Sequence, residues 1–154
     1  MKITFDIACR AVLVALELDN IPVVESFSCY YDHINNYIGM NIEDACSLEK
    51  EWYENVSQYL PNGRDFNLIL WSLLHEYGHY QDTLETWNDE DETLCRELMY
   101  MMPEDSYERR MAYFNLPSEK VATKWAADFI RENEIACREA NEFLEKYVIQ
   151  GDPI

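Results

Sequence analysis

Basic residues are scarce in this chain: 12 lysines and arginines stand against 30 aspartates and glutamates, which gives a formal net charge of −18 at pH 7. A surface of that sign repels phosphate backbones and anionic lipid headgroups, so we expect no direct binding of nucleic acid and no binding to an anionic membrane. Two interpretations of the charge remain. It is either an acidic solvated surface, or the surface of an acidic protein that occupies the basic groove of a nucleic-acid-handling enzyme.

Long apolar runs and paired cysteines are missing as well. No apolar run approaches the roughly 18 residues that a membrane-spanning helix needs. The apolar N-terminal segment is interrupted by Asp6 and Arg10 and lacks a small-residue cleavage site, unlike a signal peptide. The five cysteines form no CxxC pair, which disfavours a disulfide framework and a thiolate zinc site. These absences predict a cytoplasmic protein with reduced thiols.

Glycine and proline are also few, with 4 and 5 residues, whereas 48% of the residues are hydrophobic. This is the composition of a globular chain. No repeat or low-complexity linker divides the sequence, so we expect a single domain over residues 1–154. In the first part of the chain, apolar periodicity and turn residues predict a helix, two strands separated by a turn at 32–36, and a second helix, over residues 6–18, 22–31, 37–42 and 42–60.

A helix over residues 65–83 is expected to lie at the centre of the fold. Its first part is apolar on nearly every side, which is typical of a helix surrounded by neighbours, and Asp65 is the expected N-cap. Beyond it we expect a charged loop and three further helical segments. The last helix should be capped by Ser118, and its helical pattern continues to about residue 148; the loop and helices cover residues 85–92, 93–102, 105–114 and 118–133.

The central helix carries the segment HEYGH, residues 75–79. Residues four apart on a helix differ by about 40° of rotation, so His75 and His79 project the same way, at a spacing suited to one zinc ion. Glu76 would flank that ion, where it can hold a water molecule and take its proton as the general base. The alternative is a pair of histidines hydrogen-bonded within the core. Burying three ionisable groups on one turn without a cation is costly, so we predict a Zn²⁺ site with Glu76 as the catalytic residue.

Two histidines leave a zinc site one protein ligand short. No histidine follows His79, and His33 lies in a predicted turn far upstream, where an exposed turn residue is the simpler interpretation. Asp82 shares the helical face, but the helical rise places it about 10 Å from His75. We therefore expect Asp82 to orient a ligand histidine through its other ring nitrogen.

Glu119 is the predicted third metal ligand. It shares a helical face with Ala122 and Ala126, whose small side chains let this helix approach another closely. Gly78, inside HEYGH, offers a matching notch. The alternative is a glutamate that only complements the dipole of its own helix.

The HEYGH segment, followed about forty residues later by Glu119 and an alanine-rich helical turn, resembles the small gluzincin-type zincin metallopeptidases. The similarity is greatest to the short intracellular ImmA/IrrE-like group, many of which are encoded by phages and mobile elements. It covers roughly residues 20–135. The resemblance implies an α+β minigluzincin fold, with a twisted sheet packed on the HExxH helix and an edge strand that aligns an extended substrate. The family's Glu-Ala-Asn/Asp cluster is looser here, as Glu119-Lys-Val-Ala122, and the helix-turn-helix module that often accompanies it is absent.

Two functions follow as hypotheses. The first is a zinc metallopeptidase that cuts a basic partner protein, such as a repressor or another nucleic-acid-binding protein. The second is an acidic zincin-fold binding protein that inhibits a nucleic-acid-handling enzyme without proteolysis, as an anti-defence inhibitor would. The intact Glu76 favours the enzyme, whereas the charge excess and the lack of an identified oxyanion donor favour the inhibitor. Four tyrosines are close enough in sequence to donate a phenol, namely Tyr77, Tyr80, Tyr107 and Tyr113.

Overall fold

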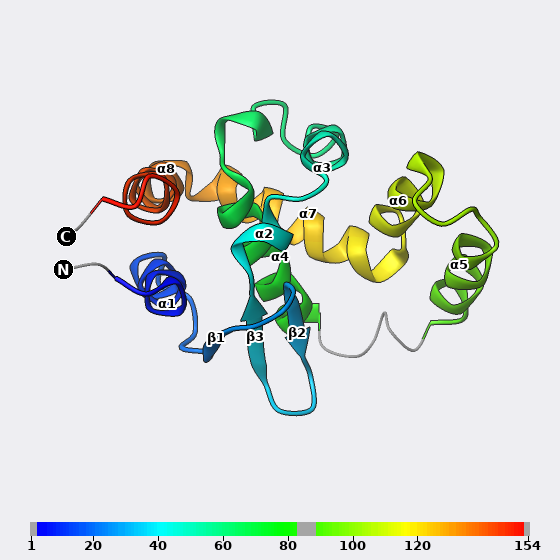
Figure 1. Cartoon of the computed structure of the whole chain (residues 1–154), viewed down its shortest axis with the longest axis horizontal. Coiled ribbons are helices and arrows are strands. Elements are labelled where there is room, and N and C mark those ends of the chain that lie inside the picture. Colours follow the sequence, from blue (N-terminus) through cyan, green and yellow to red (C-terminus); the bar gives the residue numbers. More distant parts are fainter. Residues whose placement is uncertain (1–2, 83–88, 153–154) are drawn as a thin grey trace.

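Helix α4 (Leu68–Asp82) runs through the middle of the molecule, and the other elements pack around it (Figure 1). The computed structural model describes residues 3–82 and 89–152. Within these ranges the fold is α+β, with a small three-stranded sheet among the helices. The other strands and main helices are, in chain order, α1 (Phe5–Ala15), β1 (Val23–Glu25), β2 (Tyr30–Asp32), β3 (Tyr37–Met40), α2 (Ile42–Ala45), α3 (Glu49–Val56), α5 (Glu90–Tyr100), α6 (Tyr107–Phe114), α7 (Pro117–Glu132) and α8 (Glu134–Leu144).

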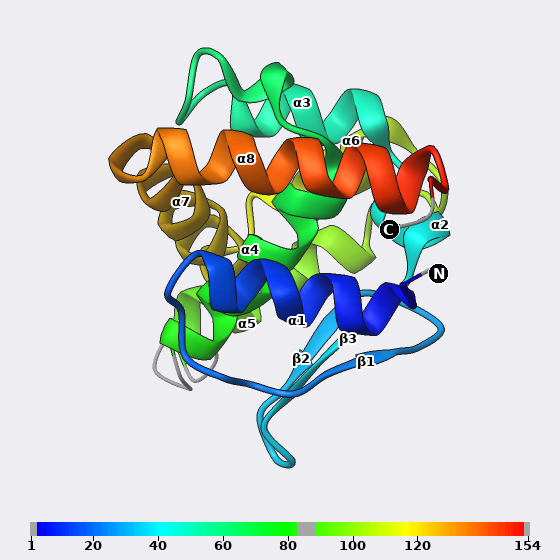
Figure 2. The same ribbon diagram turned by 90° about the vertical axis from the view of Figure 1, so that its left-hand side faces the viewer.

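The expected central position of α4 is confirmed, because every residue from Leu68 to His79 is buried. On the face that Figure 2 turns toward the viewer, α1 and α8 lie next to each other in front of α4. Helix α7 makes the most extensive contact with α4 of any element, and β2 and β3 also pack against α4. None of the helices in the described ranges has the length and apolar character needed to cross a membrane.

The sheet has three strands where the sequence predicted two. The segment expected as one strand over 22–31 leaves the sheet after Glu25 and returns at Tyr30, so that β1 and β2 lie on opposite sides of β3. β1 runs parallel to β3, and β2 runs antiparallel to it. The predicted turn is present: Asp32 Oδ1 accepts hydrogen bonds from the backbone N–H groups of Ile34 and Asn35, at 2.9 Å each.

Local caps move several helix ends from their predicted positions. Asp65 does not cap α4; it belongs to a 3-10 turn (Gly63–Asp65), and Asn67 instead accepts a hydrogen bond from the N–H of Leu70 at 2.9 Å. The helix expected over 42–60 is divided into α2 and α3 because Leu48 adopts a left-handed conformation, with φ 55°. α1 extends only to Ala15, since Glu17 also has a positive φ.

The second half of the chain is helical, as expected, with different boundaries. Of the loop predicted over 85–92, residues 85–88 lie outside the described residues, and α5 already begins at Glu90 behind an Asp89 cap. Ser118 is not an N-cap; it lies inside α7, which starts at Pro117. The helical pattern up to residue 148 is interrupted at Asn133, whose ψ of 42° ends α7 before α8 and a final π-helical turn (Glu145–Ile149).

The predicted close approach at Gly78 is confirmed. A Cβ atom built on Gly78 would lie 2.7 Å from the carbonyl oxygen and 3.0 Å from the Cα of Ala122. Both atoms belong to the backbone of α7, so neither can move aside without moving the helix. The absence of a side chain at Gly78 therefore sets the distance between α4 and α7.

We expect Gly78→Ala to lower the free energy of unfolding by about 1–3 kcal/mol, the usual cost of overpacking a core contact. Urea denaturation of the metal-free proteins measures this difference. The double variant Gly78→Ala/Ala122→Gly is the control, because removing the Ala122 side chain does not remove the backbone atoms that clash. Full rescue by the second substitution would show that this explanation is wrong.

Candidate metal centre

One buried carboxylate links the two histidines of HEYGH. Oε1 of Glu119 lies 2.9 Å from Nε2 of His75, and Oε2 of Glu119 lies 3.0 Å from Nε2 of His79. All three side chains are buried, and the two imidazole rings stand edge to face with their centroids 4.8 Å apart. The structure thus brings together the residues from α4 and α7 that the sequence singled out as metal ligands.

His75 is held on its other side by Thr123. Nδ1 of His75 lies 3.0 Å from the hydroxyl oxygen of Thr123, which is one turn beyond Glu119 on α7. The Trp52 ring packs against the same imidazole edge to face, with centroids 5.4 Å apart. With Nδ1 protonated and donating to Thr123, Nε2 presents its lone pair toward Glu119, the arrangement that a metal ligand needs. The sequence analysis missed Thr123, although its i+4 spacing from Glu119 places both on one face of α7.

Glu76 completes a buried group that could hold a metal ion. One ligand atom from each of His75, Glu76 and His79 lies within 4.8 Å of the others. Burial raises the pKa of Glu76, and the negative charge of Glu119 acts in the same direction, while the two histidines oppose them. Two sets of three ligands are therefore available, because either Glu76 or Glu119 can join the two imidazoles.

The start of α7 is fixed by a second buried carboxylate, that of Glu92 on α5. Its oxygens accept hydrogen bonds from the backbone N–H of Ser118 at 3.0 Å and from the Ser118 hydroxyl at 2.6 Å. Arg96, one turn further along α5, contacts the same carboxylate at 2.9 Å. A carboxylate at this position complements the positive end of the α7 dipole. Because Ser118 immediately precedes Glu119, Glu92 also fixes the position of the proposed ligand.

The other two candidates from the sequence have different surroundings. Asp82 is half-buried at the C-terminal end of α4, and its negative charge contributes to raising the pKa of His79. That contribution is compatible with the predicted orienting role. His33 is exposed in the turn between β2 and β3, which agrees with its interpretation as a turn residue.

Of the four tyrosines, Tyr113 is the one that lines the cavity beside the histidines. This cavity measures about 190 Å³, and His75 and Glu76 also line it. The hydroxyl of Tyr77 accepts a hydrogen bond from the N–H of Asp19, and that of Tyr107 donates to Glu54. Burial raises the pKa of Tyr113, as do the charges of Glu119 and Glu76, so its phenol keeps its proton.

The protonation states of the linked pair follow from opposing effects. Burial lowers the pKa of His79, but the hydrogen bond and the charge of Glu119 outweigh it and raise the pKa to about 9. Burial likewise opposes ionisation of Glu119, yet the hydrogen bonds from His75 and His79 hold its pKa well below the usual range. Near neutral pH the metal-free site therefore contains a protonated His79 and an ionised Glu119.

Metal content separates the two available ligand sets. We expect Glu119→Gln to weaken zinc binding nearly as much as His75→Ala, because it removes a negative ligand, whereas Glu76→Gln should keep about one zinc per chain. Elemental analysis after dialysis against a weak chelator measures both. Asp82→Ala should cost about 10–100-fold in zinc affinity, as is typical of a residue that orients a ligand. Glu119→Gln with full zinc content, together with an empty Glu76→Gln, would reverse the assignment.

The raised pKa of His79 predicts how the stability of the metal-free protein depends on pH. A group whose pKa is higher in the folded state stabilises the fold below its unfolded-state pKa of about 6.5, and this contribution is lost as pH rises through about 9. We therefore expect the melting temperature, measured with excess chelator, to fall between pH 6.5 and 9. Glu119→Gln should largely remove this slope, since it removes the charge that raises the pKa. An identical slope in the variant would disprove the pairing.

Comparison of the chain with models of protein families and with curated proteins gives no match. Comparison of its fold with solved structures gives none either. The function has to be argued from the residues of the site.

Proposed function

We propose that this protein is a zinc-dependent metallopeptidase of zincin type that hydrolyses a peptide bond in a partner protein. The observation that carries the proposal is the carboxylate of Glu119, which contacts the Nε2 atoms of both His75 and His79 at 2.9 and 3.0 Å. Two neutral imidazoles and one carboxylate are a ligand set that zinc uses in hydrolytic enzymes, where it leaves a position for water or substrate.

The geometry of the three donors fits zinc. In a tetrahedral site with bonds of about 2.0–2.2 Å, neighbouring donor atoms are separated by about 3.3–3.5 Å. The observed separations of 2.9 and 3.0 Å are only a few tenths of an ångström shorter. His75, His79 and Glu119 would therefore hold the ion after a small outward movement. When bound, zinc supplies a Lewis acid that polarises a carbonyl group and lowers the pKa of a water molecule.

Glu76 is positioned to move the proton. It follows His75 on α4 and lines the 190 Å³ cavity, so it faces the space in which a substrate and water can meet. Its raised pKa brings it closer to neutrality, which suits a group that first accepts a proton and later delivers it to the leaving amine.

Tyr113 is the residue best placed to stabilise negative charge on the substrate. Its ring lines the same cavity, and its raised pKa keeps the hydroxyl available as a hydrogen-bond donor. A donor fixed in a cavity of this kind stabilises the oxygen of the carbonyl group as charge develops on it. The residue comes from α6 and Glu76 from α4, so the two lie on different walls of the cavity.

Strand β2 offers a place for an extended substrate. It is an edge strand of the sheet, it packs against α4, and the residue before it, Cys29, lines the cavity with His75 and Glu76. A peptide that adds to such an edge through main-chain hydrogen bonds would pass the centre. The charge of −18 favours a basic protein as substrate, because opposite charges speed association.

The same charge supports one alternative, in which the protein is an acidic inhibitor of a nucleic-acid-handling enzyme and cuts nothing. The acidic surface would then occupy the channel meant for nucleic acid. In that case the metal centre would stabilise the fold and Glu76 would be dispensable.

The Glu76→Gln variant distinguishes these functions. We expect it to keep its zinc and its fold but to lose about 10²–10⁴-fold in peptide hydrolysis, because it lacks the base and retains the ligands. The zinc-loaded wild type, this variant and Glu108→Gln, an exposed glutamate on α6, are compared on a mixture of basic peptides by mass spectrometry.

An undiminished rate in Glu76→Gln would contradict the mechanism. If no protein cleaves any substrate, yet wild type and Glu76→Gln retain and block the same partner enzyme, the inhibitor hypothesis is correct. Using the Glu76→Gln protein as bait also identifies the partner, since a bound substrate is not released by cleavage.

A further inference from the structure

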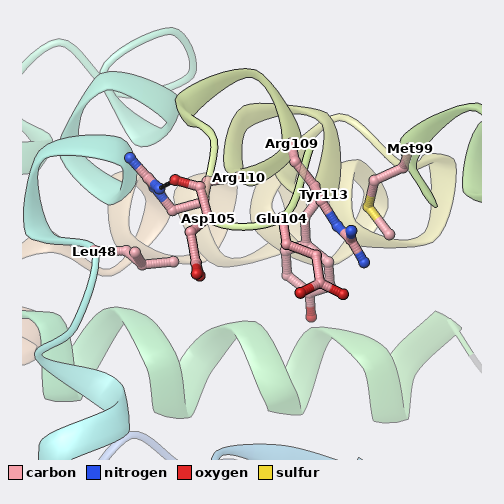
Figure 3. A pocket seen from close by; sticks show the side chains of 7 residues that line it. All are labelled: Leu48, Met99, Glu104, Asp105, Arg109, Arg110 and Tyr113. Carbon is pink, nitrogen blue, oxygen red and sulfur yellow. Dashed lines mark hydrogen bonds between the residues drawn. The ribbon is translucent and has the colours of Figure 1, made fainter. Parts of the chain in front are cut away.

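A second cavity of about 410 Å³ opens next to the metal centre (Figure 3). It lies where α6 and the end of α5 face α4, and it shares two lining residues, Leu48 and Tyr113, with the smaller cavity that contains His75 and Glu76. Its volume is within the range of about 300–1,000 Å³ that is usual for ligand pockets. A substrate bound at the metal centre would therefore extend directly into this space.

The walls of the larger cavity are apolar. Met99 is buried, and the side chains of Leu48 and Tyr113 are 40% and 44% exposed, so each presents apolar surface to the space. Methionine is flexible and polarisable, which suits a wall that contacts side chains of different shapes. Burying an apolar group against these three residues removes its surface from water and favours binding.

The charges around this cavity balance one another. Arg109 and Arg110 are matched by Glu104 and Asp105. Arg110 is held by Glu51, at 3.1 Å, and by the backbone oxygen of Asp105, at 2.6 Å; in Figure 3 its guanidinium points away from Tyr113. Because neither sign is in excess, the charged residues select neither an acidic nor a basic side chain.

The backbone at Leu48 is a separate indication that this wall has a role. Leu48 has φ 55° and ψ 38°, the left-handed region that glycine or asparagine occupies at lower cost. A leucine kept in a strained conformation points to a use for its side chain. Here that side chain lines both cavities at their junction.

We propose that the 410 Å³ cavity is the specificity pocket of the enzyme and receives a large apolar side chain, such as leucine, methionine or phenylalanine, next to the scissile bond. This inference rests on the proposed peptidase function and adds the class of residue that the site selects. The peptide main chain lies at His75 and Glu76, and the selected side chain packs against Leu48, Met99 and the ring of Tyr113.

The test uses zinc-loaded full-length protein and synthetic peptides that differ at one position, with Phe, Leu, Ala, Lys or Asp in an otherwise constant Gly/Ser sequence. For the wild type we expect kcat/KM to be about 10–100-fold higher with Phe or Leu than with Ala, Lys or Asp, as for a filled apolar pocket. In Glu104→Trp the indole fills the cavity, since Glu104 points into it (Figure 3), and the Phe/Ala ratio should fall at least tenfold.

Two further variants keep the test independent of folding defects. Glu108→Trp places the same side chain at an exposed position of α6 outside the cavity and should keep the Phe/Ala ratio. Leu48→Gly removes an apolar wall at a backbone conformation that glycine adopts without strain, so the protein should remain folded while the ratio falls.

The outcomes separate this inference from the function on which it rests. Hydrolysis without apolar preference, or with a preference that Glu104→Trp leaves unchanged, refutes the pocket and leaves the peptidase intact. If no peptide is cut, fluorescence anisotropy of the labelled peptides decides. Tighter binding of the Phe peptide that Glu104→Trp abolishes supports the pocket although the peptidase function fails, and equal binding of all five peptides refutes both.

Discussion

The contact between Glu119 and the two imidazoles of α4 is the interaction on which the rest of the structure depends. A carboxylate that is almost completely buried must have compensating partners, and His75 and His79 supply them from the neighbouring helix. The contact forms only because α4 and α7 approach closely at Gly78 and Ala122. These requirements place two ionisable groups of α4 and one of α7 at a single point in the core.

The centre was more predictable from sequence than its supports were. His75, Glu76 and His79 lie within one helical turn, so helix geometry fixes their relation, and the spacing of Glu119 from Ala122 marks a face that can pack closely. The division of the strand after Glu25 and the left-handed Leu48 depend on packing with distant segments, which local patterns do not contain. The assignment of Ser118 as an N-cap was wrong for the same kind of reason. Its hydroxyl is bonded to Glu92, 26 residues earlier in the chain.

Function in this account arises from how the surroundings divide the work among similar groups. Glu119 and Glu76 are both buried glutamates close to the same histidines, yet their pKa values are displaced in opposite directions. The hydrogen bonds to Glu119 favour its charged form, as a ligand requires, whereas burial favours the neutral form of Glu76, as proton transfer requires. Tyr113 stands where the cavity of this centre meets the larger one, and so connects the proposed chemistry to the proposed choice of substrate.

The most direct test of the central claim is the position of the metal in crystals of the zinc-loaded protein, located by anomalous diffraction at the zinc absorption edge. The account predicts one peak per chain, with Nε2 of His75, Nε2 of His79 and a carboxylate oxygen of Glu119 each within about 2.0–2.2 Å. Glu76 should lie beside the ion without binding it. A peak ligated by Glu76 in place of Glu119, or no peak at the two histidines, would contradict the account.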